Sequence, residues 1–238
     1  QVLLWSGLAA AVIALAGPRG GQVEDKRVVR SGDLLIAIDC SRSMLASDVF
    51  PDRTRQARDK ALDLVQRLPD LRVALLPFAA TPVLRCPLTS DHQALATMLD
   101  DCTPALFPSA DGWQGTAIGR AVERGLEVLK PEAGRGQAIL VISDGIDPDR
   151  AAVERATARA VERGIPVYGL FIGDATRQAI ITVAGKPVTV AGERETLDRI
   201  AAATGAISVN AGADATDVRA LASHLERIRS DSSIEERT

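Results

Sequence analysis

The sequence predicts an α/β fold with a doubly wound, mostly parallel central sheet flanked by helices, because three observations agree. Continuous apolar runs of strand length occur at 34–39, 137–143 and 165–173, as is typical of strands buried on both faces. Stretches with helical periodicity alternate with these runs, and the longest cover 53–68, 116–130 and 148–164. Residues 179–192 alternate in polarity around a glycine turn, which predicts a small β-hairpin insertion.

The remaining segments fit the same plan. Residues 72–79 and 82–89 are predicted strands, and Pro77 in the first of them indicates a bulge or an edge position. A short helix is predicted over 91–101, with Asp91 or Ser90 as its cap. A helix, a strand and a last helix follow residue 193. Strands that alternate with helices in this way predict parallel βαβ units within one domain.

The amino-acid composition argues against several classes of function. The chain has 238 residues, a net charge of −3 and only 3% aromatic residues, which argues against a nucleic-acid binder with a basic, aromatic face. The three cysteines form no CxxC pair, so a zinc knuckle is not expected. Buried free thiols are the simpler interpretation of the three cysteines, and a Cys86–Cys102 disulfide is the alternative. Two histidines leave little material for histidine-based catalysis or zinc binding.

The first 18 residues suggest an attachment to a membrane. Residues 1–17 carry no charge, and this length lies at the short end of what spans a bilayer. We expect a transmembrane helix over 1–18, with a buried core helix and a signal-peptide remnant as alternatives. A glycine- and charge-rich linker is expected over 19–32, the domain over 33–229 and a polar tail over 230–238.

Acidic and hydroxyl side chains follow two of the predicted buried strands. Asp39 ends the first strand and precedes Ser41 and Ser43, while Asp144 follows the strand 137–143 and Thr116 opens a helix between them. In open α/β sheets, ligands bind beyond the carboxyl ends of the strands, so these groups are expected to meet at one edge. Oxygen ligands of this kind suit Mg²⁺, with Mn²⁺ or Ca²⁺ as alternatives. A carboxylate from a partner protein would complete the metal's coordination.

These residue types also occur in other kinds of site. Either aspartate alone could be a helix cap or a turn residue. A phosphoryl-transfer enzyme of the haloacid-dehalogenase type needs a second aspartate two residues after the first, where this chain has Ser41. A nucleotide-binding protein needs a glycine-rich turn after the first strand, and residues 39–44 supply none. A passive scaffold with an empty metal site remains the alternative to a non-enzymatic binding module.

Three motifs in this order resemble the von Willebrand factor A (vWA) family, in the segments 39–44 (DCSRSM), 114–119 (QGTAIG) and 143–145 (SDG). In that family they form the metal-ion-dependent adhesion site, which implies Asp39, Ser41, Ser43, Thr116 and Asp144 as the metal residues. Segments 48–53 and 85–91 resemble the BatA/BatB group of bacterial membrane proteins, which is linked to aerotolerance. The resemblance implies partner vWA proteins, a MoxR-type AAA+ ATPase and an inner-membrane location. Basic residues after the first helix favour a cytoplasmic domain, whereas the family's usual topology favours the periplasm, which is our expectation.

Overall fold

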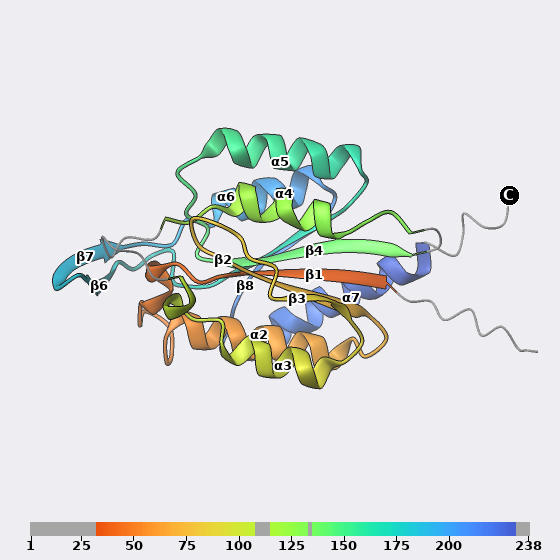
Figure 1. The fold of residues 1–238 in the computed structure, drawn as a ribbon. Helices are drawn as coiled ribbons and strands as arrows, with labels where there is room; N and C mark the ends of the chain where they lie inside the picture. Colours follow the sequence, from red (N-terminus) through yellow and green to blue (C-terminus); the bar gives the residue numbers. More distant parts are fainter. Residues whose placement is uncertain (1–31, 108–114, 133–134, 232–238) are drawn as a thin grey trace, which may run out of the picture.

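The computed structural model describes residues 32–107, 115–132 and 135–231 and places a six-stranded sheet at the centre of the molecule (Figure 1). The strand order is β3-β2-β1-β4-β5-β8, and all pairs are parallel except β2 with β3. The strands are β1 (Gly32–Asp39), β2 (Arg72–Phe78), β3 (Cys86–Thr89), β4 (Gly136–Ser143), β5 (Val167–Phe171) and β8 (Ser208–Asn210). The predicted doubly wound α/β fold is confirmed.

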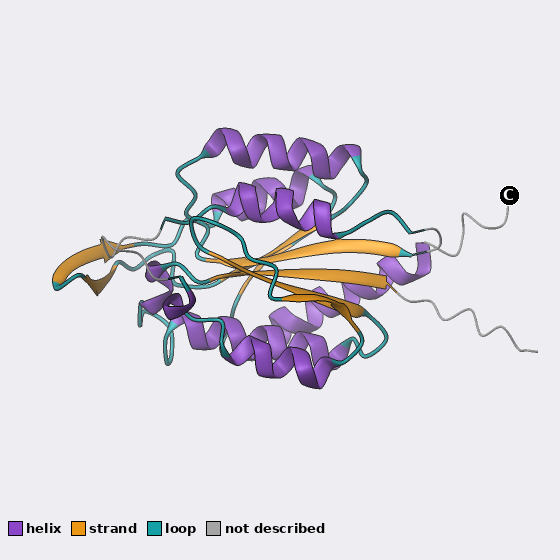
Figure 2. Cartoon of the chain, in the orientation of Figure 1, coloured by secondary structure: helices purple, strands orange, loops and turns teal. Residues whose placement is uncertain are grey.

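Helices cover both faces of the sheet (Figure 2). One face packs against α2 (Arg53–Arg67), α3 (His92–Asp100) and α7 (Thr216–Asp231), and the other against α4 (Ile118–Val128), α5 (Arg150–Glu162) and α6 (Glu195–Ala203). Alternate residues of β1 enter the two cores, Leu34 and Ile36 on one side and Leu35 and Ala37 on the other. Every residue of β1 is buried, as its continuous apolar run predicts.

The predicted hairpin is present as a separate two-stranded sheet. It consists of β6 (Ala179–Val183) and β7 (Lys186–Val190), which pair antiparallel. Ala184 and Gly185 both have positive φ, as a tight hairpin turn requires. The hairpin packs Ile181 and Val183 against Ala46, and it projects from the end of the sheet where β1 finishes (Figure 1).

The strand predicted over 82–89 is shorter than expected. The regular strand begins only at Cys86, and the register shifts between Val73 and Leu75. Before it, residues 82–85 pair irregularly with the end of β2, where the N–H of Val83 donates to the carbonyl of Pro77 at 3.0 Å. Pro77 thus lies where β2 borders an irregular segment, a position that tolerates its missing N–H. All three cysteines are buried and free, so the alternative of a Cys86–Cys102 disulfide is wrong.

The two ends of the chain fall largely outside the described part. The predicted transmembrane segment 1–18 and nearly all of the linker 19–32 lie outside the described residues, although β1 already begins at Gly32. Within the described residues, no helix is both long and apolar enough to cross a bilayer. Most of the predicted tail 230–238 is likewise not described.

Candidate metal site

The candidate site lies where β1 and β4 end side by side. These strands run parallel with Ile38 paired to Ile142, so Asp39 and Asp144 emerge at the same edge of the sheet. Both side chains are buried, with 1% and 0% of their residue surface exposed. Two carboxylates in one buried place repel each other unless positive charge balances them.

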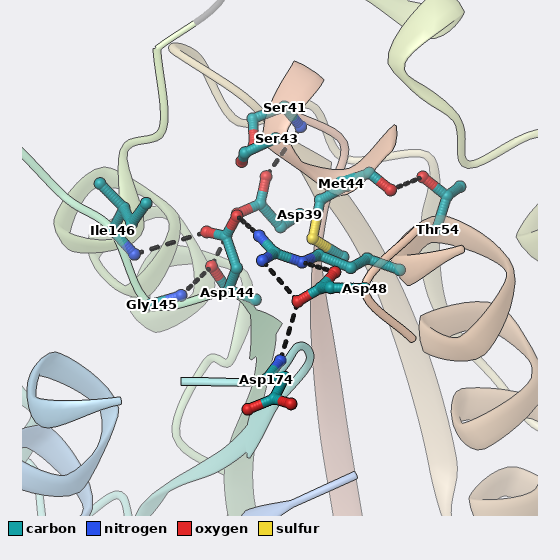
Figure 3. A network of polar contacts seen from close by, with 12 residues as sticks. Asp39, Ser41, Ser43, Met44, Asp48, Thr54, Asp144, Gly145, Ile146 and Asp174 are labelled. Atoms are coloured by element: carbon teal, nitrogen blue, oxygen red, sulfur yellow. Dashed lines mark hydrogen bonds and ion pairs between the residues drawn. The ribbon is translucent and has the colours of Figure 1, made fainter. Parts of the chain in front are cut away.

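A short hydrogen-bonded network surrounds Asp39 (Figure 3). Its Oδ1 accepts a bond from the backbone N–H of Ser41 at 2.8 Å, and its Oδ2 accepts one from the hydroxyl of Ser143 at 2.6 Å. The hydroxyl oxygens of Ser41 and Ser43 lie 2.9 Å apart, because the chain turns into the short 3₁₀ helix η1 (Arg42–Leu45) immediately after Ser41. Cys40 points away into the core, as its position between the motif residues predicts.

Asp144 completes the cluster from β4. Ser43 lies near enough to its carboxylate to oppose the rise of its pKa, and the backbone N–H of Ile146 approaches Oδ1 at 3.5 Å. Oδ2 accepts a bond from Nη1 of Arg53 at 2.8 Å. The side chains of Asp39, Ser41, Ser43 and Asp144 are thus brought together as the sequence predicts.

Burial sets the ionisation of the two carboxyl groups. Burial, and then the nearby charge of Asp144, raise the pKa of Asp39 to about 7, although hydrogen bonds from Ser143 and Ser41 oppose the rise. Burial also raises the pKa of Asp144, against the lowering effects of Ser43 and Arg53. The pair therefore gains most from a bound cation at a pH where both groups are ionised.

Thr116 lies on the loop ahead of α4, close to the loop that follows Asp144, and its approach to the four side chains of the cluster stays a prediction. It is 9% exposed and lines a cavity of about 180 Å³ together with Asp147, Arg120 and neighbouring residues. Oδ2 of Asp147 accepts a bond from the backbone N–H of Gly119 at 3.0 Å, which ties the chain after Asp144 to the start of α4. Thr116 is thereby held next to the loop that follows Asp144.

The donor set suits a hard divalent cation. The predicted metal residues offer carboxylate and hydroxyl oxygens, which Mg²⁺ and Mn²⁺ accept and which soft metals do not favour. Within the described ranges, no group of three or more histidine, cysteine, aspartate or glutamate side chains forms a cluster of the kind that holds a metal. A cation at the strand ends would therefore rest on two carboxylates, the hydroxyls and water.

Three residues of the site were not predicted from the sequence. Arg53 and Asp48 form the buried ion pair that reaches Asp144, and Ser143 supplies the shortest bond to Asp39. Ser143 was within reach of sequence reasoning, because it directly precedes Asp144. Arg53 and Asp48 lay in a segment noted only for its resemblance, and nothing local shows that an arginine at a helix start is buried.

Comparison with known proteins indicates the family to which the chain belongs. The model of the von Willebrand factor type A domain matches residues 34–146. A UPF0353 protein of Mycolicibacterium paratuberculosis is 29% identical over 215 residues, and the match covers 84% of this chain and 61% of that protein. The chain thus spans less than two thirds of that relative's length.

Solved structures show the same fold over most of the chain. BatB from Bacteroides thetaiotaomicron is 30% identical, with 84% of this chain and 99% of that one covered and a TM-score of 0.76. An aerotolerance-related membrane protein from Bacteroides fragilis is 25% identical, covers 84% and 99%, and has a TM-score of 0.69. Proximal thread matrix protein 1 from the mussel byssus, solved with a zinc-occupied metal-ion-dependent adhesion site, shares the fold at 17% identity, with 85% and 46% covered and a TM-score of 0.58.

The match to BatB extends over almost all of that chain, and the family model covers the segment that holds the aspartate and serine motifs. The chain belongs to the von Willebrand factor type A domain family, and within it to the BatB-like group.

Proposed function

We propose that this chain is a non-enzymatic, metal-dependent protein-binding module of a bacterial membrane protein. The proposed metal residues are Asp39, Ser41, Ser43, Thr116 and Asp144, and the proposed cation is Mg²⁺. The observation that carries the proposal is the pair of buried carboxylates at adjoining strand ends, with two serine hydroxyls 2.9 Å apart beside them.

The chemistry of these groups favours a cation that still needs a ligand from outside. Hydroxyl groups bring no charge, so a dication held by Ser41, Ser43 and Thr116 and by carboxylates through water stays under-neutralised. A partner's aspartate or glutamate would complete its shell, and the attraction is stronger at a partly dehydrated edge than in bulk water. The zinc-occupied adhesion site of the mussel protein supports the idea that a domain of this fold can hold a dication.

The same residues argue for binding rather than catalysis. Ser41 stands where a phosphoryl-transfer enzyme of similar topology would need its acid, two residues after Asp39. Asp39 and Asp144 are already engaged by Ser143 and Arg53, and both are buried, so neither is presented to a substrate as a free nucleophile. Binding of a partner's carboxylate through a metal needs no free nucleophile.

The wider setting is proposed from the relatives. The Bacteroides fragilis relative is named a membrane protein, which supports membrane attachment of this chain. We place the transmembrane helix at 1–18, the linker at 19–32, the vWA domain at 33–229 and the polar tail at 230–238. The domain would face the periplasm and act with other vWA membrane proteins and a MoxR-type ATPase.

The proposed function is tested by a pull-down from solubilised membranes of the source bacterium with the chain immobilised. We expect a set of proteins that binds in Mg²⁺, is released by a chelator and is not bound by the Ser41→Ala/Ser43→Ala variant. Serine variants are preferred to Asp144→Ala, because removal of Asp144 would leave Arg53 buried with one partner fewer. Capture that is unchanged by both the chelator and the variant would refute metal-dependent binding.

A further inference from the structure

Arg53 is a fully buried cation next to the proposed metal site. It is the first residue of α2 and is 0% exposed. A buried arginine is costly unless its donors and its charge are matched. Near a site for a dication it would also repel the metal, so its presence there calls for an explanation.

Asp48 supplies that explanation. Nε and Nη2 of Arg53 bind Oδ1 and Oδ2 of Asp48, both at 2.8 Å, in the two-pronged geometry that arginine forms with carboxylates. The remaining terminal nitrogen, Nη1, binds Oδ2 of Asp144. Arg53 thus binds Asp48 through the edge formed by Nε and Nη2 and binds Asp144 through Nη1, and the charge of Asp48 cancels its own.

The ion pair is held so that it cannot turn away. The backbone N–H of Asp174, after β5, binds Oδ2 of Asp48 at 2.9 Å (Figure 3). The guanidinium group also lies against the backbone of Gly173, where an added Cβ would come within 3.0 Å of Nε and 3.1 Å of Cζ. Contacts from three separate parts of the chain therefore fix the position of Arg53, and through it Oδ2 of Asp144.

The charges at the strand ends then favour a cation. Because Asp48 neutralises Arg53, the negative charges of Asp39 and Asp144 act on the cation without a competing positive charge beside them. Without Asp48, the cluster would carry an uncancelled positive charge next to the cation.

We propose that Asp48 and Arg53 belong to the metal site as positioning residues: a neutral buried ion pair fixes Asp144 without opposing the cation's charge. Neither residue contacts the metal. This inference rests on the proposed function, because it assumes a cation at Asp39 and Asp144.

The test is the affinity for Mn²⁺, read from the electron paramagnetic resonance signal of the free ion during titration of the full chain. Asp48→Asn keeps the size of the side chain and removes its charge. We expect its affinity to fall about tenfold, because one negative charge near the dication is lost at an effective dielectric between those of protein and water. The matched control is Asp33→Asn, since Asp33 binds Arg72 with the same two-pronged geometry at 2.8 Å, at the opposite end of β1. Its affinity should stay within about twofold of wild type.

A double variant separates charge from stability. Adding Arg53→Met to Asp48→Asn removes the uncancelled positive charge, and we expect the double variant to bind Mn²⁺ more tightly than Asp48→Asn without being more stable to heat. If Asp48→Asn does not fold, the double variant is compared with wild type directly, and a several-fold loss is expected because Asp144 is no longer fixed.

Three outcomes are distinct. Wild-type affinity in Asp48→Asn, or a fall of equal size in Asp33→Asn, would overturn the inference and leave the metal site intact. Equal or weaker binding by the double variant than by Asp48→Asn would show that charge cancellation is not the role of Asp48. Failure of the wild-type chain to bind Mn²⁺ would instead overturn the proposed function.

Discussion

The pH dependence of metal binding follows from the raised pKa of Asp39. Burial and the charge of Asp144 raise the pKa of the Asp39 carboxyl group from 3.8 to about 7 in the metal-free fold. The folded chain therefore holds a proton that the unfolded chain releases. This contribution of Asp39 to the stability of the metal-free protein is fully present below about pH 4 and is lost as the pH rises to about 7. A bound cation instead favours the ionised form of Asp39, because the carboxylate is the form that attracts the metal.

The size of the effect can be worked from that pKa. A proton that must leave before the metal binds weakens the apparent affinity about tenfold per pH unit below about pH 7. The apparent Kd for Mn²⁺ should then be about fifty times higher at about pH 5 than at pH 7, and nearly constant above about pH 8. The pKa of Asp144 is also raised, so the dependence on pH is not expected to be shallower than this.

Isothermal titration calorimetry in two buffers of different ionisation enthalpy measures both the affinity and the protons released. We expect about half a proton to be released at pH 7 and nearly one at about pH 5.5. Asp39→Asn should bind weakly with a flatter pH profile, whereas Asp33→Asn should keep the wild-type profile. An affinity that is constant from about pH 5 to pH 7, with no proton release, would refute the reasoning.

Two further predictions concern stability. Mg²⁺ or Mn²⁺ at about a hundred times its Kd should stabilise the wild-type fold by about 2.7 kcal/mol and raise its Tm by about 5–10 °C. The Ser41→Ala/Ser43→Ala variant should lose this response. Identical melting curves of the wild-type chain with and without metal would favour a passive scaffold. Ser143→Ala removes the 2.6 Å bond to Asp39 and the acceptor for the N–H of Gly145, so we expect a loss of about 1–3 kcal/mol in urea unfolding together with weaker Mn²⁺ binding at neutral pH. The control Ser223→Ala, at an exposed position of α7, should change stability by less than about 0.5 kcal/mol, and an equal loss in both variants would contradict the assigned role of Ser143.

Local patterns were enough to predict most of the fold. The apolar run 34–39 predicts a strand buried on both faces, and all of β1 is buried. Asp91 or Ser90 was predicted to cap a helix, and the cap is Asp91, whose side chain accepts bonds from the backbone N–H groups of Gln93 and Ala94. These predictions are correct because hydrophobic periodicity and helix capping depend on neighbours a few residues away in the chain. The strand predicted over 82–89 is shorter in the structure, because its pairing depends on the register of β2, which is set elsewhere in the chain.

The sequence by itself also determined which residues would meet at the end of the sheet. Parallel strands carry their carboxyl ends to one edge, so Asp39 and Asp144 had to lie together once β1 and β4 were neighbours. Thr116, ahead of α4, lies near Asp147 in the loop that follows Asp144, and its place in the metal site stays a prediction.

Only the tertiary structure decided how the charges at that edge are balanced. Arg53 is 91 positions from Asp144 in the chain, and its bond to Asp48 forms within a loop whose shape depends on Gly173 and Asp174 after β5. An arginine at the start of a helix is ordinarily exposed, so its sequence position indicates nothing about burial. Whether a charge is buried and paired depends on which distant groups the fold brings against it, and no local pattern in the chain encodes that.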